Sequence, residues 1–123
     1  MVEATSSARI VLTTAASPEE ASRMGLKLVE ERLAACATLV PTVESIYRWK
    51  DDIETSTETL LLLKTEAGQL AALEARLHEL HSYQTPEFLV LGVDSGSQRY
   101  LSWLHASLEP VEQAAELAKP AGH

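Results

Sequence analysis

Cysteine and glycine are scarce in this sequence, with one cysteine and five glycines among 123 residues. The single thiol, Cys36, cannot form a disulfide within the chain, so we expect a cytoplasmic location. A chain with so few glycines is a poor candidate for a glycine-rich phosphate-binding loop. Cys-x-x-Cys and His-Glu-x-x-His motifs are also missing, which excludes the commonest zinc-binding patterns.

Positive charge and long apolar runs are lacking as well. Ten Lys and Arg against 18 Asp and Glu leave a formal net charge of −8, which argues against nucleic acid or an anionic membrane as a partner. No apolar run approaches the ~20 residues of a membrane-spanning helix, and the first residues lack the apolar core of a signal peptide. Because no nucleophile stands at a suggestive spacing from a base, we predict that the chain is not an enzyme.

Residues 35–65 form the most informative stretch that is present. They predict two long strands, 36–49 and 53–64, around a polar tip at residues 50–52. Pro41 cannot donate to a strand ladder, so we expect a bulge there. Arms of about 12–14 residues span roughly 40–45 Å, whereas typical strands have ~3–10 residues. A small domain cannot cover such arms alone, so either they bend or another chain covers them.

The remaining segments read as alternating strands and amphipathic helices. Ser17 can cap the first helix, and Glu20 would complete a capping box. Leucines at spacings of three and four mark the apolar face of the second helix. The predicted elements around the hairpin are a strand at 9–14, a helix at 17–32, a helix at 66–81, a strand at 87–94 and a helix at 98–108.

This order, β-α-β-β-α-β-α, is typical of an α+β fold, the ferredoxin-like (split βαβ) sandwich, here with an extended central hairpin. We assign the domain to residues 8–108, a loose arm to 1–7, and a tail or short docked helix to 109–123. Two helices would cover one face of the sheet and leave the other face apolar and open. Self-association is the simplest way to cover that face.

Three blocks of sequence are together highly specific: LAACA at 33–37, SIYRW at 45–49 and HSYQTPE at 81–87. In these blocks the chain resembles the CutA family of divalent-cation tolerance proteins, over roughly residues 8–108. It departs from the family pattern at the hairpin tip, where Asp51 replaces the usual glycine. It departs again after the motif histidine, where Ser82 replaces proline and Gln84-Thr85 replaces Glu-Val.

The resemblance implies a homotrimer in which long strands of neighbouring subunits pair, with a link to tolerance of copper and other divalent cations. The trimer would be similar in architecture to PII-type signalling proteins, which bind small ligands between subunits. Three functions follow as hypotheses: a divalent-cation, chiefly copper, binding protein; a PII-like sensor of a small molecule; and a trimeric scaffold for another protein.

The candidate metal ligands are His81, Cys36 and Glu87. His81 alternatively complements the dipole at the end of the second helix. In a third reading, His78 and His81, three residues apart on one helix face, together bind a soft cation. Cys36 is a good soft ligand as thiolate, but a small buried hydrophobic role is an alternative.

The candidate residues of an intersubunit cleft are Lys64, Tyr83, Tyr47, Trp49 and Trp103. Lys64 would either attract an anionic ligand or form an ion pair with Glu87. The large aromatic side chains are typical of interface anchors. The acidic residues near the hairpin tip, which we expect to be solvated, are Asp51, Asp52, Glu54 and Glu58.

Overall fold

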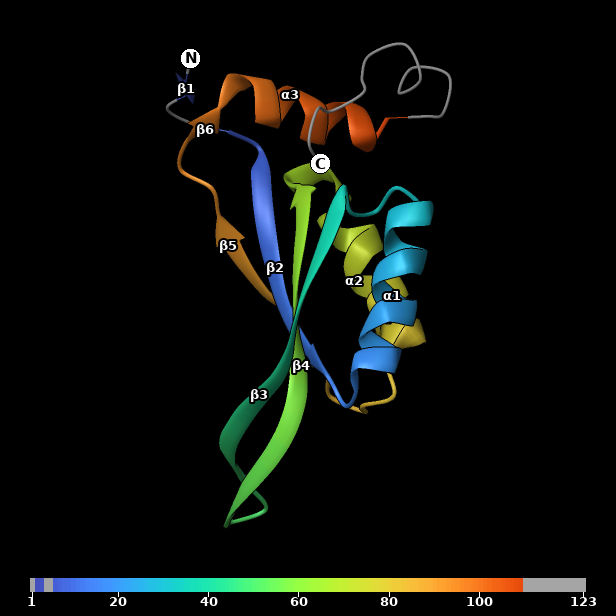
Figure 1. Cartoon of the computed structure of the whole chain (residues 1–123), viewed down its shortest axis with the longest axis vertical. Helices are drawn as coiled ribbons and strands as arrows, with labels where there is room; N and C mark the ends of the chain where they lie inside the picture. The colour runs from blue at the N-terminus through green and yellow to red at the C-terminus, as the bar shows by residue number, and fades with distance from the viewer. Residues whose placement is uncertain (1, 4–5, 110–123) are drawn as a thin grey trace.

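The computed structural model describes residues 2–3 and 6–109, so the predicted tail beyond Glu109 lies outside the described residues. A four-stranded antiparallel sheet, in the order β3-β4-β2-β5, forms the centre of the molecule (Figure 1). Its strands are β2 (Ala8–Ala15), β3 (Cys36–Trp49), β4 (Asp52–Glu66) and β5 (Leu89–Gly92), and the helices are α1 (Pro18–Glu30), α2 (Leu70–Leu80) and α3 (Gln98–Ser107).

The strand order and connections confirm the predicted ferredoxin-like, split βαβ fold. Both α1 and α2 pack on one face of the sheet, and α3 lies across its upper end (Figure 1). The structure adds a small second sheet that the sequence pattern did not predict, in which β1 (Val2–Glu3) pairs with β6 (Gly96–Ser97).

The local sequence explains where α1 begins. Ser17 is the N-cap, its hydroxyl accepts a hydrogen bond from the Glu20 N–H, and Pro18 occupies the first turn. The predicted capping box is only half formed, because the Glu20 carboxylate accepts from the Ala16 N–H instead of the Ser17 N–H. The carboxylate is thereby directed toward the loop that follows α2.

The core lies between the helices and the sheet. Leu61 and Leu63 of β4 are fully buried with Val11 of β2, and they pack with Leu73 and Leu77 of α2. The predicted leucine stripe on α2 is therefore confirmed. The helix begins later than predicted, because β4 continues to Glu66 and a short 3-10 turn, η1 (Ala67–Gln69), precedes α2.

The long hairpin of β3 and β4 has arms of 14 and 15 residues. Its tip is a two-residue turn, Lys50-Asp51, with both residues at positive φ (51° and 71°), while Asp52 already pairs with Trp49. The predicted bulge is confirmed by a register shift between Val40 and Val43. Beyond the bulge the hairpin extends away from the helices (Figure 1).

The sheet face opposite α1 and α2 is apolar and half exposed. Leu89 and Leu91 of β5 are 54% and 46% exposed, and Leu12 and Leu62 beside them are partly buried. The strand β5 is shorter than the predicted 87–94, because residues 87–88 and 93–94 lie outside it, although Phe88 still packs against the core.

At the upper end of the sheet, α3 covers a second, smaller core. Ser97 caps α3 by accepting from the Tyr100 N–H. Leu104 of α3 is buried with Ala8 and Ala35, and aromatic side chains of the same helix border this cluster. No helix in the described part of the chain is long and apolar enough to cross a membrane.

Candidate functional site

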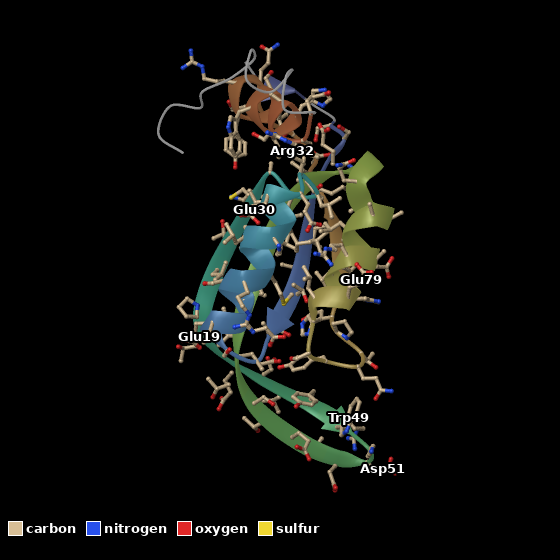
Figure 2. All side chains as sticks on the ribbon, turned by 90° about the vertical axis from the view of Figure 1, so that its right-hand side faces the viewer. Glu19, Glu30, Arg32, Trp49, Asp51 and Glu79 are labelled. Atoms are coloured by element: carbon tan, nitrogen blue, oxygen red, sulfur yellow. The ribbon has the colours of Figure 1, made fainter. Side chains whose placement is uncertain are left out.

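Six of the eight predicted site residues fall into two groups on one chain. The upper group lies near α3 and contains Cys36, Lys64 and Trp103. The lower group, around the loop after α2, contains His81, Tyr83 and Tyr47, and Trp49 lies farther out at the hairpin tip. Figure 2 shows how far Trp49 and Asp51 stand from the labelled residues of the helices. One chain therefore does not assemble the whole predicted cleft.

His81 is the centre of the lower group, and its side chain is fully buried. Its Nε2 lies 2.7 Å from the Thr14 carbonyl oxygen, and its Nδ1 accepts from the Tyr83 N–H at 3.0 Å. A carbonyl can only accept and an amide N–H can only donate, so Nε2 carries the proton and Nδ1 does not. The ring is the neutral Nε2–H tautomer with both nitrogens occupied.

Glu20 closes the lower group from the side of α1. Its Oε2 accepts from the Ser82 N–H at 2.8 Å and its Oε1 from the Ala16 N–H at 3.2 Å. Burial alone raises the pKa of this carboxyl, but the hydrogen bonds from Ser82 and Ala16 outweigh burial and lower the pKa below its usual value. Glu20 Oε2 also lies 3.9 Å from His81 Nδ1, which is not an ion pair while that nitrogen is unprotonated.

Tyr83 links the loop to the hairpin. Its hydroxyl donates to Glu58 Oε2 at 2.6 Å, and its ring lies 4.6 Å from the His81 ring, centroid to centroid. Burial and the bond to Glu58 raise the pKa of Tyr83 well above its ordinary value. The prediction that Glu58 is solvated is wrong, because this residue is only 9% exposed and its carboxylate binds the Tyr83 hydroxyl.

The upper group is organised around Lys64. Its Nζ lies 5.9 Å from the centre of the Tyr100 ring, a cation–π distance, and Tyr100 lies 5.3 Å from Trp103, centroid to centroid. Cys36 stands opposite Lys64 in the strand register, with Sγ 3.6 Å from Thr38 Oγ1.

The alternative ion pair between Lys64 and Glu87 is not formed. The strand β2 lies between β4 and β5, and Glu87 stands in the loop before β5, where it is exposed. The pairing of His78 with His81 is not formed either. His78 is exposed on α2, whereas His81 caps the helix in an extended conformation and is buried.

The three predicted metal ligands do not meet within one chain. Cys36 pairs with Lys64 on β4, whereas the His81 ring bonds to Thr14, whose partner on β4 is Leu60. Four residues along a strand separate these positions by ~13 Å, far more than the ~2.0–2.3 Å of metal–ligand bonds. Among the residues that the structure describes, no three His, Cys, Asp or Glu side chains are grouped to hold a metal ion.

The chain as a whole matches a known family. Residues 9–107 match the sequence profile of the CutA1 divalent ion tolerance proteins. The chain belongs to this family. The Escherichia coli divalent-cation tolerance protein CutA is 46% identical over 99 residues, which cover 80% of this chain and 88% of the relative.

Solved structures of the family have the same fold. CutA from Synechococcus elongatus matches with a TM-score of 0.85 and 38% identity, over 89% of this chain and 96% of that chain. The same protein has a structure complexed with a Bis-Tris molecule (TM-score 0.81, 37% identity, 87% and 99% coverage). A relative from Archaeoglobus fulgidus, described as a periplasmic divalent cation tolerance protein, matches with a TM-score of 0.81 and 31% identity, over 83% and 99%.

The CutA-type motif around His81 therefore has more partners than sequence reasoning identified. Glu58 was assigned to the solvated tip and Glu20 only to the start of α1. In the structure, Glu20 accepts a hydrogen bond from the Ser82 N–H, and Glu58 accepts one from the Tyr83 hydroxyl. No local signal reveals these contacts, because they join residues 62 and 25 positions apart. Only the folding of the loop onto β4 and α1 brings them together.

Proposed function

We propose that this chain acts in the cytoplasm as a homotrimeric protein that binds divalent cations, copper above all, and contributes to cation tolerance. The observation that carries this proposal is membership of the CutA1 family over residues 9–107. We propose a binding role and not catalysis, because the family is named for ion tolerance. The periplasmic relative makes the compartment a point to test by cell fractionation.

The trimer is supported by surfaces that one chain leaves uncovered. The hairpin beyond the bulge exposes Ile46, Trp49 and Ile53 by 66%, 51% and 61%. The open sheet face adds Leu89 and Leu91. Apolar surface gathered in this way marks protein interfaces. Sedimentation equilibrium should give three times the 13.4 kDa mass of the chain.

The cation site of this proposal draws on more than one subunit, because one chain does not bring its candidate ligands together. Cys36 is the strongest candidate. Among residues 2–3 and 6–109, its sulfur has only the distant Thr38 hydroxyl as a hydrogen-bond neighbour, and soft thiolates favour monovalent copper and zinc. Glu87 is exposed and free to face a neighbouring subunit.

Isothermal titration of the purified oligomer with copper tests this site. We expect Cys36→Ser, which keeps the size of the side chain, to weaken copper binding at least tenfold. Glu54→Gln, at an exposed acid of the hairpin, serves as the control and should bind as the native chain does. Unchanged affinity in Cys36→Ser would remove Cys36 from the site.

A small-molecule sensor is the second candidate function, and the Bis-Tris complex of the Synechococcus relative favours it. In this chain the lysine and aromatic side chains of the upper group would form one wall of the cleft. A thermal-shift screen of metabolites against metals separates the two functions, because a ligand that binds only the folded state stabilises it by RT ln(1 + [L]/Kd).

A further inference from the structure

The buried ring of His81 has no nitrogen to spare, which points to a role other than metal binding. We infer that His81 is a positioning residue: through Tyr83 it fixes the base of the long hairpin, and it is not a ligand of the divalent cation. The statement about the cation rests on the proposed function. The statement about the hairpin stands on the contacts of residues 81–83 alone.

Metal coordination would require His81 to give up bonds that the fold already uses. A metal binds an imidazole only through an unprotonated ring nitrogen. Coordination at Nδ1 would displace the Tyr83 N–H, and coordination at Nε2 would remove its proton and break the bond to the Thr14 carbonyl. The side chain is also fully buried, so a cation would have to open the loop to reach it.

Three consecutive residues each bind a different element, and together they form a joint. The ring of His81 bonds to Thr14 at the end of β2, and the Ser82 N–H donates to Glu20 of α1. The hydroxyl of Tyr83 donates to Glu58 of β4. In Figure 1 this segment lies at the lower end of the body, where α1 begins and the hairpin departs.

The hydrogen bond between Tyr83 and Glu58 reaches the hairpin immediately beyond its bulge. Glu58 pairs with Val43, the first residue pair beyond the bulge. Glu58 is 9% exposed as a residue, and a buried charge without a partner is costly. The Tyr83 hydroxyl therefore holds Glu58, and the His81 ring holds Tyr83, both through the Tyr83 N–H and by ring contact.

Hydrogen exchange of the full chain, measured by mass spectrometry, tests the joint. We expect His81→Gln and Tyr83→Phe each to accelerate exchange in residues 43–49 and 53–58 about tenfold, with residues 61–65 unchanged. Because both side chains act through one series of contacts, the double variant should exchange no faster than about twice the faster single variant. His78→Gln, an exposed histidine on the same helix, is the matched control and should change nothing.

Measurements of cation binding distinguish a positioning role of His81 from a role as a metal ligand. We expect His81→Gln to bind copper within twofold of the native affinity, and the nitrogen NMR signals of His81 to keep the Nε2–H pattern when zinc is added. A tenfold loss of copper affinity with unchanged hairpin exchange would overturn the inference, as would zinc-dependent shifts of the His81 ring nitrogens.

The two proposals fail in different ways. If the native chain binds no divalent cation, the proposed function is wrong, but the exchange experiment still decides whether His81 fixes the hairpin. If His81→Gln does not fold, Tyr83→Phe keeps the aromatic ring and removes only the hydroxyl, so unchanged hairpin exchange in that variant would itself overturn the positioning role.

Discussion

The two halves of the long hairpin have similar strand character but opposite surroundings. The inner half pairs residues 36–40 with 60–64, and β2 and the helices cover it. The outer half pairs residues 43–49 with 52–58 and has no other strand beside it in the described chain. An isolated two-stranded hairpin is marginally stable in water. Within the described chain, the outer half therefore lacks the neighbouring strand and the helices that cover the inner half.

The largest expected effect on stability comes from truncating Leu61, a core leucine of the inner half. Leu61→Ala should cost about 2–5 kcal/mol of unfolding free energy, because Leu61 is fully buried and its truncation leaves a cavity. Ile46→Ala in the outer half, examined in dilute monomer, should cost less than about 0.5 kcal/mol. Urea denaturation of both variants measures the difference. Equal costs would mean that the two halves are equally packed.

The next effect concerns assembly. Trp49→Ala should weaken the proposed trimer by about 1–3 kcal/mol per interface, because exposed tryptophans that become buried dominate interface energies. Leu26→Ala is the matched control, since Leu26 is 62% exposed on α1, on the helical side of the molecule. Sedimentation equilibrium over a range of concentrations checks both variants. Weakening by Leu26→Ala instead would place the interface on the helices.

A smaller effect on stability is expected at the bulge, which separates the two halves of the hairpin. Thr42 in the bulge has φ 64°, a left-handed conformation that costs a residue with a Cβ about 1–2 kcal/mol. Thr42→Gly relieves this strain and should stabilise the chain by about 0.5–1 kcal/mol, after the greater unfolded-state freedom of glycine is included. Thr57→Gly, in regular strand opposite Glu44, should instead destabilise by about 0.5–1 kcal/mol. Thermal unfolding would contradict this view if both variants changed stability in the same direction.

The smallest effect is a pH dependence of stability at Glu66, the end of β4 that is remote from the hairpin tip. His105 of α3 binds Glu66 at 2.9 Å through Nδ1 and Glu109 at 2.8 Å through Nε2. The hydrogen bond to Glu66 is the main cause of the raised pKa of His105. The protonated ring therefore stabilises the fold fully below its unfolded pKa of ~6.5, and this stabilisation is lost as the pH rises through the raised folded pKa.

The size of this pH effect is limited by water. The His105 side chain is 57% exposed, so we expect at most about 0.5 kcal/mol. Unfolding of the native chain and of His105→Gln, followed from pH 5 to pH 8.5, measures it. The two stability curves should converge at the upper end of that range, and parallel curves would exclude the contribution.

Much of the fold could be predicted because local patterns agree with the tertiary structure. The cap at Ser17 and the leucine stripe of α2 are local signals, and both hold. The bulge at Pro41 follows from the missing N–H of proline and the broken alternation around it. The β1–β6 pair escaped prediction because two-residue strands have no periodicity to detect.

The candidate site was predicted less completely, for a physical reason. His81 and Tyr83 stand out in the sequence, but the partners of their side chains do not. Glu58 resembles its acidic neighbours in the hairpin, but it is buried and accepts a hydrogen bond from a residue 25 positions away. Contacts of Cys36, Lys64 and Glu87 with a neighbouring subunit belong to the proposed trimer, so the roles of these residues are proposals as well.

The bulge also fixes which way the outer hairpin faces. Three residues of β3 advance from Val40 to Val43 while β4 advances only two, from Leu60 to Glu58. The extra residue reverses the alternation, so the odd-numbered residues of the outer half, Tyr47 and Trp49 among them, lie on the side that Val40 occupies before the bulge. Deleting one residue at Thr42 would turn these aromatic side chains to the opposite side without changing any of them. In this part of the chain, the insertion or deletion of a single residue therefore changes the exposed surface more than most substitutions do.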